Sequence, residues 1–191
     1  MFACLEHEVL PALARSAAAY GRDLAAWSAG CASGEEPYTL ALVWELALAP
    51  AYPQLELEIL ATDLDPVMLE RARTACYESG SLCDLPEDWR LRGFELEHGL
   101  FRLRPELRRR VTLLQHDIRN RAPGGPFDLV LCRNLAFTYF EPELQVEVCA
   151  TLAGCLRPGG ALVVGAHESL PDPADAFLSW EGARAVYRRR G

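Results

Sequence analysis

Short apolar runs alternate along this chain with longer segments in which apolar residues recur at helical spacing. The runs that predict buried strands are residues 22–29, 55–63, 111–117 and 127–134. The segments that predict helices are residues 5–20, 38–49, 66–77 and 142–156. Such alternation is typical of βαβ units. We therefore expect an α/β fold with a doubly wound, mostly parallel sheet of the Rossmann-like type.

The last part of the chain predicts a change of strand direction. Residues 157–160 (RPGG) predict a turn, and residues 161–168 (ALVVGAHE) predict another strand. Residues 175–189 alternate on both sides of Glu181 and Gly182, which indicates a terminal hairpin. An antiparallel edge added to a doubly wound sheet accounts for it.

Residues 78–105 break the alternation, with glycines and prolines between short mixed pieces. We interpret them as a short inserted subdomain within a single domain spanning residues 1–191. A chain of 191 residues, half of them hydrophobic, is long enough for one such domain with a sizeable core.

Charge and cysteine content narrow the functional classes. A net charge of -8 and a pI near 5.1 argue against nucleic acid or an anionic membrane as the main partner. Basic residues gather at 102–110 and 188–190, as on a solvated helix face or a patch for an acidic protein. Seven cysteines without C-x2-C spacing indicate neither a metal site nor a disulfide framework. Without a signal peptide or a membrane span, we expect a cytoplasmic protein.

The loop after the first predicted strand is followed at once by two carboxylates, Glu35 and Glu36. Ligands of open α/β sheets bind at the carboxyl ends of strands, and Gly30 and Gly34 allow unusual backbone angles there. The loop lacks G-x-G-x-x-G and G-K-[ST], and its carboxylates would repel a pyrophosphate. A cationic ligand fits better, such as S-adenosylmethionine with its amino group or sulfonium. First-turn helix residues are the alternative interpretation of both glutamates.

Further candidates follow the next two predicted strands. Asp63 ends the second, where a carboxylate can accept both hydroxyls of a ribose, although aspartate is also a common turn residue. Asp117 and Ile118 close the third and would offer an adenine ring a polar acceptor and an apolar face. Together with the first loop, these residues favour a nucleoside ligand.

We assign no catalytic role to the other histidine, cysteine and serine side chains that could be reactive. We interpret His116 as a solvated strand-end residue and Cys31 as a small loop filler. The triplet His167, Glu168 and Ser169 cannot form a hydrolase relay, because consecutive residues on a strand point to opposite faces. No G-x-S-x-G motif supplies a nucleophile.

Several segments together resemble the CheR-type methyltransferases of bacterial chemotaxis and related signalling systems. They are WSAGCASGEEPYTLAL, ILATDLD, FRLRPELRRRVTLLQHDI, GPFDLVLCRN with YFEPELQ, and LRPGGALVVGAHESL. The match runs in order over residues 2–170, and the G-E-E-P-Y ending is specific to that family. The resemblance implies a class I S-adenosylmethionine-dependent fold. It also implies methyl transfer to the γ-carboxylate of a receptor glutamate, with S-adenosylhomocysteine as product.

The resemblance also implies roles for individual residues. Gly30 and Glu36 would contact the methionine moiety, with Glu35 as an open alternative. Arg133 would hold the incoming carboxylate by bidentate hydrogen bonds, unless it forms a structural ion pair. The residues expected to bind the cofactor are Gly30, Gly34, Glu36, Asp63, Asp117, Ile118, Arg133 and Asn134. Those expected to be catalytic are Arg133 and Tyr139.

The sequence departs from the family pattern in three places. One extra residue separates R-N from Y-F, which displaces Tyr139 from its expected place near the methyl group. The N-terminal helical domain of the family, which covers the cofactor and supplies an arginine, is expected to be missing. Residues 78–105 correspond to the β-subdomain with which some members hold a receptor tail, but they form a short version.

The sequence therefore predicts a protein-glutamate O-methyltransferase in signal transduction, acting on an acidic protein such as a receptor cytoplasmic domain. It predicts neither nucleic-acid binding nor membrane insertion. A noncatalytic module that senses S-adenosylmethionine or docks a signalling partner is the alternative, and methylation of a small carboxylic acid is a third possibility. The acceptor, the activity of this chain alone and the oligomeric state stay open.

Overall fold

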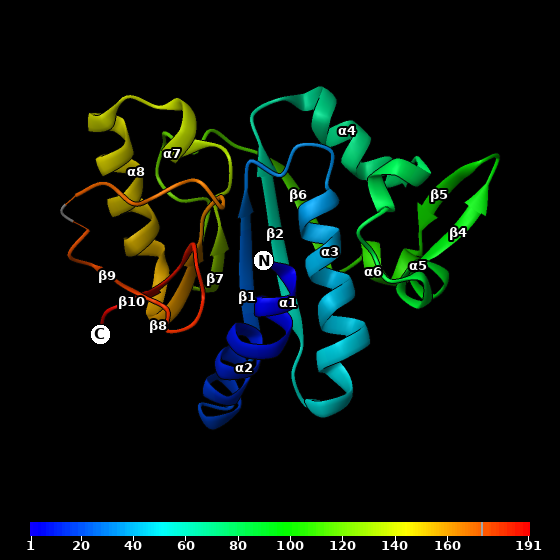
Figure 1. Ribbon diagram of the computed structural model, residues 1–191, viewed down its shortest axis with the longest axis horizontal. Helices are drawn as coiled ribbons and strands as arrows, with labels where there is room; N and C mark the ends of the chain where they lie inside the picture. Colours follow the sequence, from blue (N-terminus) through cyan, green and yellow to red (C-terminus); the bar gives the residue numbers. More distant parts are fainter. Residues whose placement is uncertain (173) are drawn as a thin grey trace.

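The computed structural model describes residues 1–172 and 174–191 and contains a seven-stranded sheet with helices on both faces (Figure 1). Its strands are β1 Leu24–Ala29, β2 Leu57–Asp63, β6 Val111–Gln115, β7 Phe127–Leu131, β8 Leu156–Val163, β9 Phe177–Ser179 and β10 Val186–Arg189. Their order is β6-β2-β1-β7-β8-β10-β9. The first five pair in parallel, whereas β10 is antiparallel to β8 and β9. The expected doubly wound sheet and terminal hairpin are confirmed.

The helices also follow the predicted pattern. The N-terminal helix consists of α1 Phe2–Cys4, η1 Leu5–Val9 and α2 Leu10–Ala19. The other helices of the main fold are α3 Glu35–Val43 with η2 Trp44–Leu48 and η3 Ala49–Ala51, α4 Pro66–Thr74, α6 Pro105–Arg108, α7 Ala136–Tyr139 and α8 Pro142–Cys155. Pro66 opens α4 as expected, and the Asp65 carboxylate caps the helix by accepting from the Val67 N–H.

Apolar side chains on alternate strand positions form two cores, one on each face of the sheet. On β1, Leu24 and Ala26 face the N-terminal helix and α3, whereas Trp27 and Ala29 face α8. Strands β7 and β8 alternate in the same way. A central strand buried on both sides needs an almost continuous apolar run, which explains why the sequence shows little polar alternation there.

The inserted segment forms a second, three-stranded antiparallel sheet. Its strands are β3 Cys76–Tyr77, β4 Phe94–Glu97 and β5 Leu100–Leu103, in the order β3-β5-β4, with helices η4 Ser79–Leu82 and α5 Glu87–Gly93. It lies at the end of the molecule opposite α8 (Figure 1). Tyr77 and Phe94 belong to the same core as the apolar residues of α3, so the small sheet packs against the main sheet domain.

Three local predictions were wrong. The helix predicted over residues 66–77 ends at Thr74, and Cys76–Tyr77 form β3. Residues 157–160 do not form a turn but belong to β8, where the pairing register with β7 shifts between Phe127 and Leu129. Gly159 has φ +78°, and a Cβ on Gly160 would approach the Asp128 carbonyl to 3.0 Å, so the two glycines form a bulge instead. The following strand ends at Val163 rather than at Glu168, because Glu168 folds back onto the Gly165 N–H.

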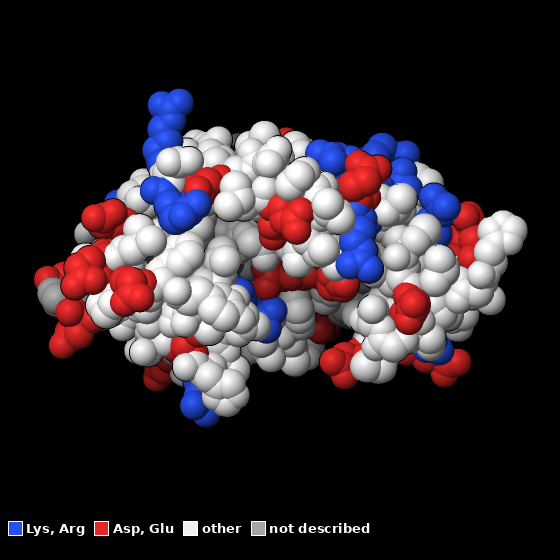
Figure 2. Space-filling view, turned by 90° about the horizontal axis from the view of Figure 1, so that it is seen from above, with Lys and Arg blue, Asp and Glu red and all other residues white. Residues whose placement is uncertain are grey.

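The strand order places a topological switch point between β1 and β7. From β1 the chain adds β2 and β6 on one side of the sheet, and it then adds β7 and β8 on the other side. The carboxyl ends of β1, β2 and β7 therefore meet at one edge. Figure 2 looks onto this end of the molecule and shows a hollow that contains both acidic and basic side chains. Within the described part of the chain, no helix has the length and apolarity needed to cross a membrane.

Candidate functional site

The loop between β1 and α3 wraps around the end of β2. The Gly30 and Cys31 N–H groups both donate to the Thr62 carbonyl, at 2.8 and 2.9 Å. Ala32 donates to the Asp63 carboxylate, and Gly34 donates to the Cys31 carbonyl. Because these amides already have acceptors, the loop offers little to a phosphate, in agreement with its lack of phosphate-binding spacing.

Gly30 and Gly34 both have positive φ, at +78° and +93°, as their positions in the loop suggested. Their surroundings differ. A Cβ on Gly30 would lie 2.5 Å from Cδ2 of Leu135, whereas one on Gly34 would meet the ring of Tyr38 and the Ala72 methyl. Gly30 thus permits close approach of the loop after β7, and Gly34 permits packing of α3 against α4.

Asp63, the last residue of β2, uses both carboxylate oxygens to organise the site. Oδ2 accepts from the Ala32 N–H at 2.8 Å, and Oδ1 accepts from the Asp65 N–H at 2.9 Å. Each carboxylate oxygen can accept a further hydrogen bond. Asp63 is therefore fixed in place and keeps capacity for two hydroxyl groups.

A cavity of about 270 Å³ lies beside Asp63. It is lined by Gly30, Thr62, Asp63, Leu64, His116, Asp117, Ile118, Arg119, Leu135 and Phe140. Four residues that the sequence singled out as cofactor-binding come together here. Leu135 and Phe140 were missed, because nothing in their local sequence distinguishes a cavity wall from a core position.

Asp117 has a partner that sequence reasoning also missed. Both of its carboxylate oxygens accept from Arg119, with the shortest distance, 2.6 Å, from Nη2 to Oδ2. These hydrogen bonds hold the pKa of Asp117 below its usual range. Ile118 beside it is buried and presents an apolar surface to the cavity.

His116 and Cys31 have structural surroundings. The His116 ring packs edge-on against Trp27, and Nε2 lies 2.9 Å from the Arg121 carbonyl, so Nε2 carries a proton. This half-buried packing differs from the solvated position expected for it. Burial, together with the Asp63 and Glu36 carboxylates, raises the pKa of the Cys31 thiol to about 12, so it stays protonated at neutral pH.

Glu36 and Arg133 form an ion pair between the first turn of α3 and the end of β7. Arg133 Nη1 donates to Glu36 Oε2 at 2.9 Å, and the Ser28 hydroxyl donates to Oε1 at 2.7 Å. Burial raises the pKa of Glu36, while the Ser28 hydrogen bond and the Arg133 charge act in the opposite direction. The structural ion pair, which was the alternative interpretation of Arg133, is thus present. The negative charge of Glu36 is balanced by Arg133 within the protein.

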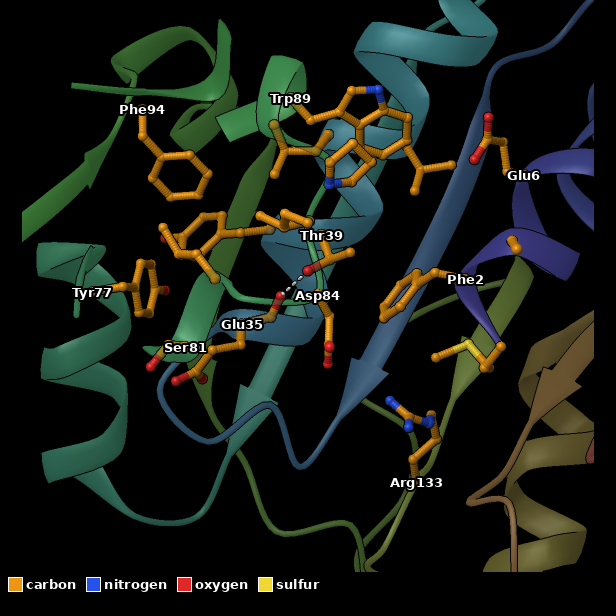
Figure 3. Close-up of a pocket in the computed structure, with 18 residues that line it drawn as sticks. Phe2, Glu6, Glu35, Thr39, Tyr77, Ser81, Asp84, Trp89, Phe94 and Arg133 are labelled. Atoms are coloured by element: carbon orange, nitrogen blue, oxygen red, sulfur yellow. Dashed lines mark hydrogen bonds between the residues drawn. The ribbon is translucent and has the colours of Figure 1, made fainter. Parts of the chain in front are cut away.

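A second cavity, of about 510 Å³, lies between the N-terminal helix, α3 and the inserted segment. Figure 3 shows Phe2 and Glu6 on one side and Tyr77, Trp89 and Phe94 on the other. Glu35, Asp84 and Arg133 also line it. Arg133 therefore contacts Glu36 and reaches the larger cavity with the same side chain.

Asn134 and Tyr139 lie differently from the other expected site residues. The Asn134 side chain is exposed, and its backbone has φ +50°. Tyr139, at the end of α7, is 73% exposed, and neither of these two cavities has it in its lining. Among the described residues, no cluster of histidine, cysteine or carboxylate side chains could hold a metal ion.

Comparison with known proteins agrees with this geometry. Residues 1–186 match the family model described as CheR methyltransferase, SAM binding domain. A solved TehB-like SAM-dependent methyltransferase from Corynebacterium glutamicum superimposes with a TM-score of 0.52 at 14% identity, covering 93% of this chain and 87% of that chain. This structural likeness supports the fold.

Curated relatives are longer than this chain. A chemotaxis protein methyltransferase of Listeria innocua is 35% identical over 92% of this chain, which spans 64% of that protein's length. Chemotaxis protein methyltransferase 1 of Pseudomonas aeruginosa is 33% identical, with 92% and 65% covered. An uncharacterised 104.1 kDa protein of Rhodobacter capsulatus is 36% identical, and the chain spans 18% of it.

Proposed function

The chain belongs to the CheR methyltransferase family, whose SAM-binding domain it carries, and from this premise we propose that it methylates a protein glutamate. In this proposal the methyl donor is S-adenosylmethionine and the product is a γ-glutamyl methyl ester. The observation that carries the proposal is the cavity at the switch point. There a fixed carboxylate, Asp63, faces apolar walls beside a loop whose amides are already satisfied.

The residues of the smaller cavity suit a nucleoside without phosphates. Asp63 has acceptor capacity left for the two ribose hydroxyls. Ile118, Leu135 and Phe140 offer apolar surface for the adenine ring, and Asp117 offers an acceptor for its amino group. We propose that these residues hold the adenosine half of the cofactor, with Gly30 allowing the loops to close around it.

The larger cavity suits the glutamate that accepts the methyl group. S-adenosylmethionine supplies a methyl group already activated by a sulfonium, so a carboxylate nucleophile needs alignment and desolvation rather than a general base. Arg133 donates to Glu36 through Nη1 and has further N–H groups at the cavity. We propose that these groups orient the incoming glutamate carboxylate, while Glu36, itself held by the Ser28 hydroxyl, fixes the guanidinium. We propose that Asn134, which lines neither cavity and whose N–H donates to Glu168, acts on the cofactor only through the positions of its neighbours Arg133 and Leu135.

Relatives named chemotaxis protein methyltransferases favour a receptor cytoplasmic domain as the acceptor. Such an acceptor would be an acidic protein, and the chain would act in the cytoplasm. The larger cavity carries its own acidic groups, Glu6, Glu35 and Asp84, so we expect the acceptor to enter as a single glutamate beside Arg133 rather than as an acidic stretch.

The test is transfer from radiolabelled S-adenosylmethionine to receptor-containing bacterial membranes and to a purified receptor cytoplasmic fragment. We expect label that base releases as methanol, as an ester requires. A fragment with the labelled glutamates replaced by glutamine is expected to accept no label. Base-stable label would contradict glutamate methylation and would indicate another acceptor group.

The exposed position of Tyr139 supports a second candidate function. The resemblance implies a tyrosine near the transferred methyl group, and Tyr139 does not lie there. In that case the chain would be a noncatalytic module that binds S-adenosylmethionine. Calorimetry distinguishes the two: cofactor binding without any transfer to membranes would support the module and contradict the enzyme.

A further inference from the structure

Glu168, which follows β8, accepts hydrogen bonds from four different residues at this edge of the sheet. Oε2 accepts from the Asn134 N–H at 2.9 Å and from the Gly165 N–H at 2.5 Å. Oε1 accepts from the Leu135 N–H at 3.2 Å and from the Thr138 hydroxyl. One side chain thus joins the loop after β8 to the segment between β7 and the end of α7.

The segment that Glu168 holds is conformationally unfavourable on its own. Asn134 adopts a left-handed backbone with φ +50°, which costs free energy unless its surroundings stabilise it. Gly165 is also constrained, because a Cβ there would collide with the Asn134 side chain and the Glu168 carboxylate. The loop therefore depends on a close approach that only a glycine at 165 and an acceptor at 168 allow.

The consequence extends to the smaller cavity. Leu135, whose N–H donates to Glu168, lies against Gly30 and lines that cavity. Phe140, one residue after α7, lines it as well. Arg133, next to Asn134 in the chain, forms the ion pair with Glu36. Displacement of residues 133–138 would move one wall of the cavity and the end of the ion pair together.

We propose that Glu168 is a positioning residue for cofactor binding, which holds Leu135 and the start of α7 in place without touching the ligand. This inference rests on the proposed function, since it takes the smaller cavity to be the adenosine site. A neutral amide cannot fully replace the carboxylate, because its NH2 group cannot accept a hydrogen bond. With the NH2 group in the place of Oε1 the Leu135 N–H loses its acceptor, and with the NH2 group in the place of Oε2 the Asn134 and Gly165 N–H groups lose theirs.

The test compares Glu168→Gln with Glu143→Gln, which removes the same charge from an exposed position on the neighbouring helix α8. Loss of the acceptor for backbone N–H groups of residues 133–138 predicts that Glu168→Gln weakens S-adenosylmethionine binding about tenfold in calorimetry. Adenosine is expected to lose the same factor, because the displaced wall contacts the nucleoside half. Thr138→Val should show a smaller loss in the same direction, and Thr138→Ser should restore binding.

Hydrogen exchange of the ligand-free protein provides an independent readout. Glu168→Gln is expected to speed exchange of the Asn134, Leu135 and Gly165 amides and to leave the Ala32 amide, which donates to Asp63, unchanged. Unchanged exchange at all three amides would overturn the positioning role even if binding fell. Faster exchange with unchanged affinity would also overturn it. If the wild type binds no cofactor, the proposed function fails, and the positioning role for cofactor fails with it, whereas the exchange data still report on the loop.

Discussion

At the scale of single residues, the ion pair between Glu36 and Arg133 changes what the sequence suggested. Two glutamates at the start of a helix looked like ligands for a cation, yet Glu36 already faces a guanidinium inside the protein. Pattern alone could not show this, because Arg133 lies 97 residues away in the chain. Glu35, by contrast, lines the larger cavity and accepts from the Ser33 hydroxyl.

Arg133→Ala tests the ion pair. Removal of the arginine leaves a mostly buried carboxylate without its charge partner, so we expect a loss of roughly 1–3 kcal/mol in the free energy of unfolding. The double variant Glu36→Gln with Arg133→Ala should recover part of this loss. Denaturant titration measures both, and Arg73→Ala, which breaks an exposed pair with Glu70, is the control with little expected effect.

The same variant should show a pH signature. Burial raises the pKa of Glu36 above its ordinary value of 4.5, and loss of the Arg133 charge would raise it further. Between the ordinary and the raised pKa, the folded state binds more protons than the unfolded state, so stability falls as pH rises. The stability deficit of Arg133→Ala is therefore expected to shrink as pH is lowered toward 4.5. A deficit that does not depend on pH would contradict this account of Glu36.

Other single residues could be predicted well from the sequence. Asp63 and Gly30 lie at the end of β2 and in the loop after β1, as strand-end residues in open α/β sheets should. Glu168 could not be predicted as an organiser of the loop after β7. Glu168 reaches the site only because the chain turns back after Val163 and places its carboxylate beside residues 133–138.

At the scale of elements, the approach of two loops at Gly30 determines the shape of the smaller cavity. Both the positive φ of Gly30 and its contact with Leu135 oppose a larger side chain. Leu135 is flexible at its end, so an added Cβ would displace it rather than break the loop. The expected consequence is a change in the cavity more than in the fold.

Gly30→Ala tests this point, with Gly21→Ala as a control. Gly21 has φ +61° but nothing within 4 Å of its added Cβ, so it reports backbone strain alone. Both variants should lose about 1–2 kcal/mol of stability from the left-handed backbone. Only Gly30→Ala is expected to weaken binding of S-adenosylhomocysteine, measured by calorimetry. Equal affinities in the two variants would show that the contact with Leu135 does not shape the site.

The elements themselves were predictable wherever periodicity was clear. Strands β1, β2, β6 and β7 and helices α4 and α8 lie where their apolar patterns placed them. The bulge at residues 157–160 was missed, because R-P-G-G has the composition of a turn and only pairing with β7 reveals a strand. A bulge depends on the neighbouring strand, which local sequence does not encode.

At the scale of the whole molecule, the doubly wound order brings the ends of β1, β2 and β7 to one edge and so assembles residues from distant parts of the chain. Of the basic residues at 102–110, for which the sequence left open a solvated face or a patch for an acidic protein, Arg102, Arg104 and Arg110 bind glutamates within the protein. These three side chains therefore contribute to internal structure more than to an acidic partner. The larger cavity beside the inserted segment had no signal in the sequence, because it forms between elements that are far apart in the chain.

The most direct test of the central claim is a crystal structure of this chain with S-adenosylhomocysteine. We predict that both ribose hydroxyls donate to the Asp63 carboxylate and that the adenine ring lies against Ile118 and Leu135 in the smaller cavity. Binding of the nucleoside in the larger cavity, or in any position where Asp63 makes no contact with the ribose, would contradict the assignment of the site.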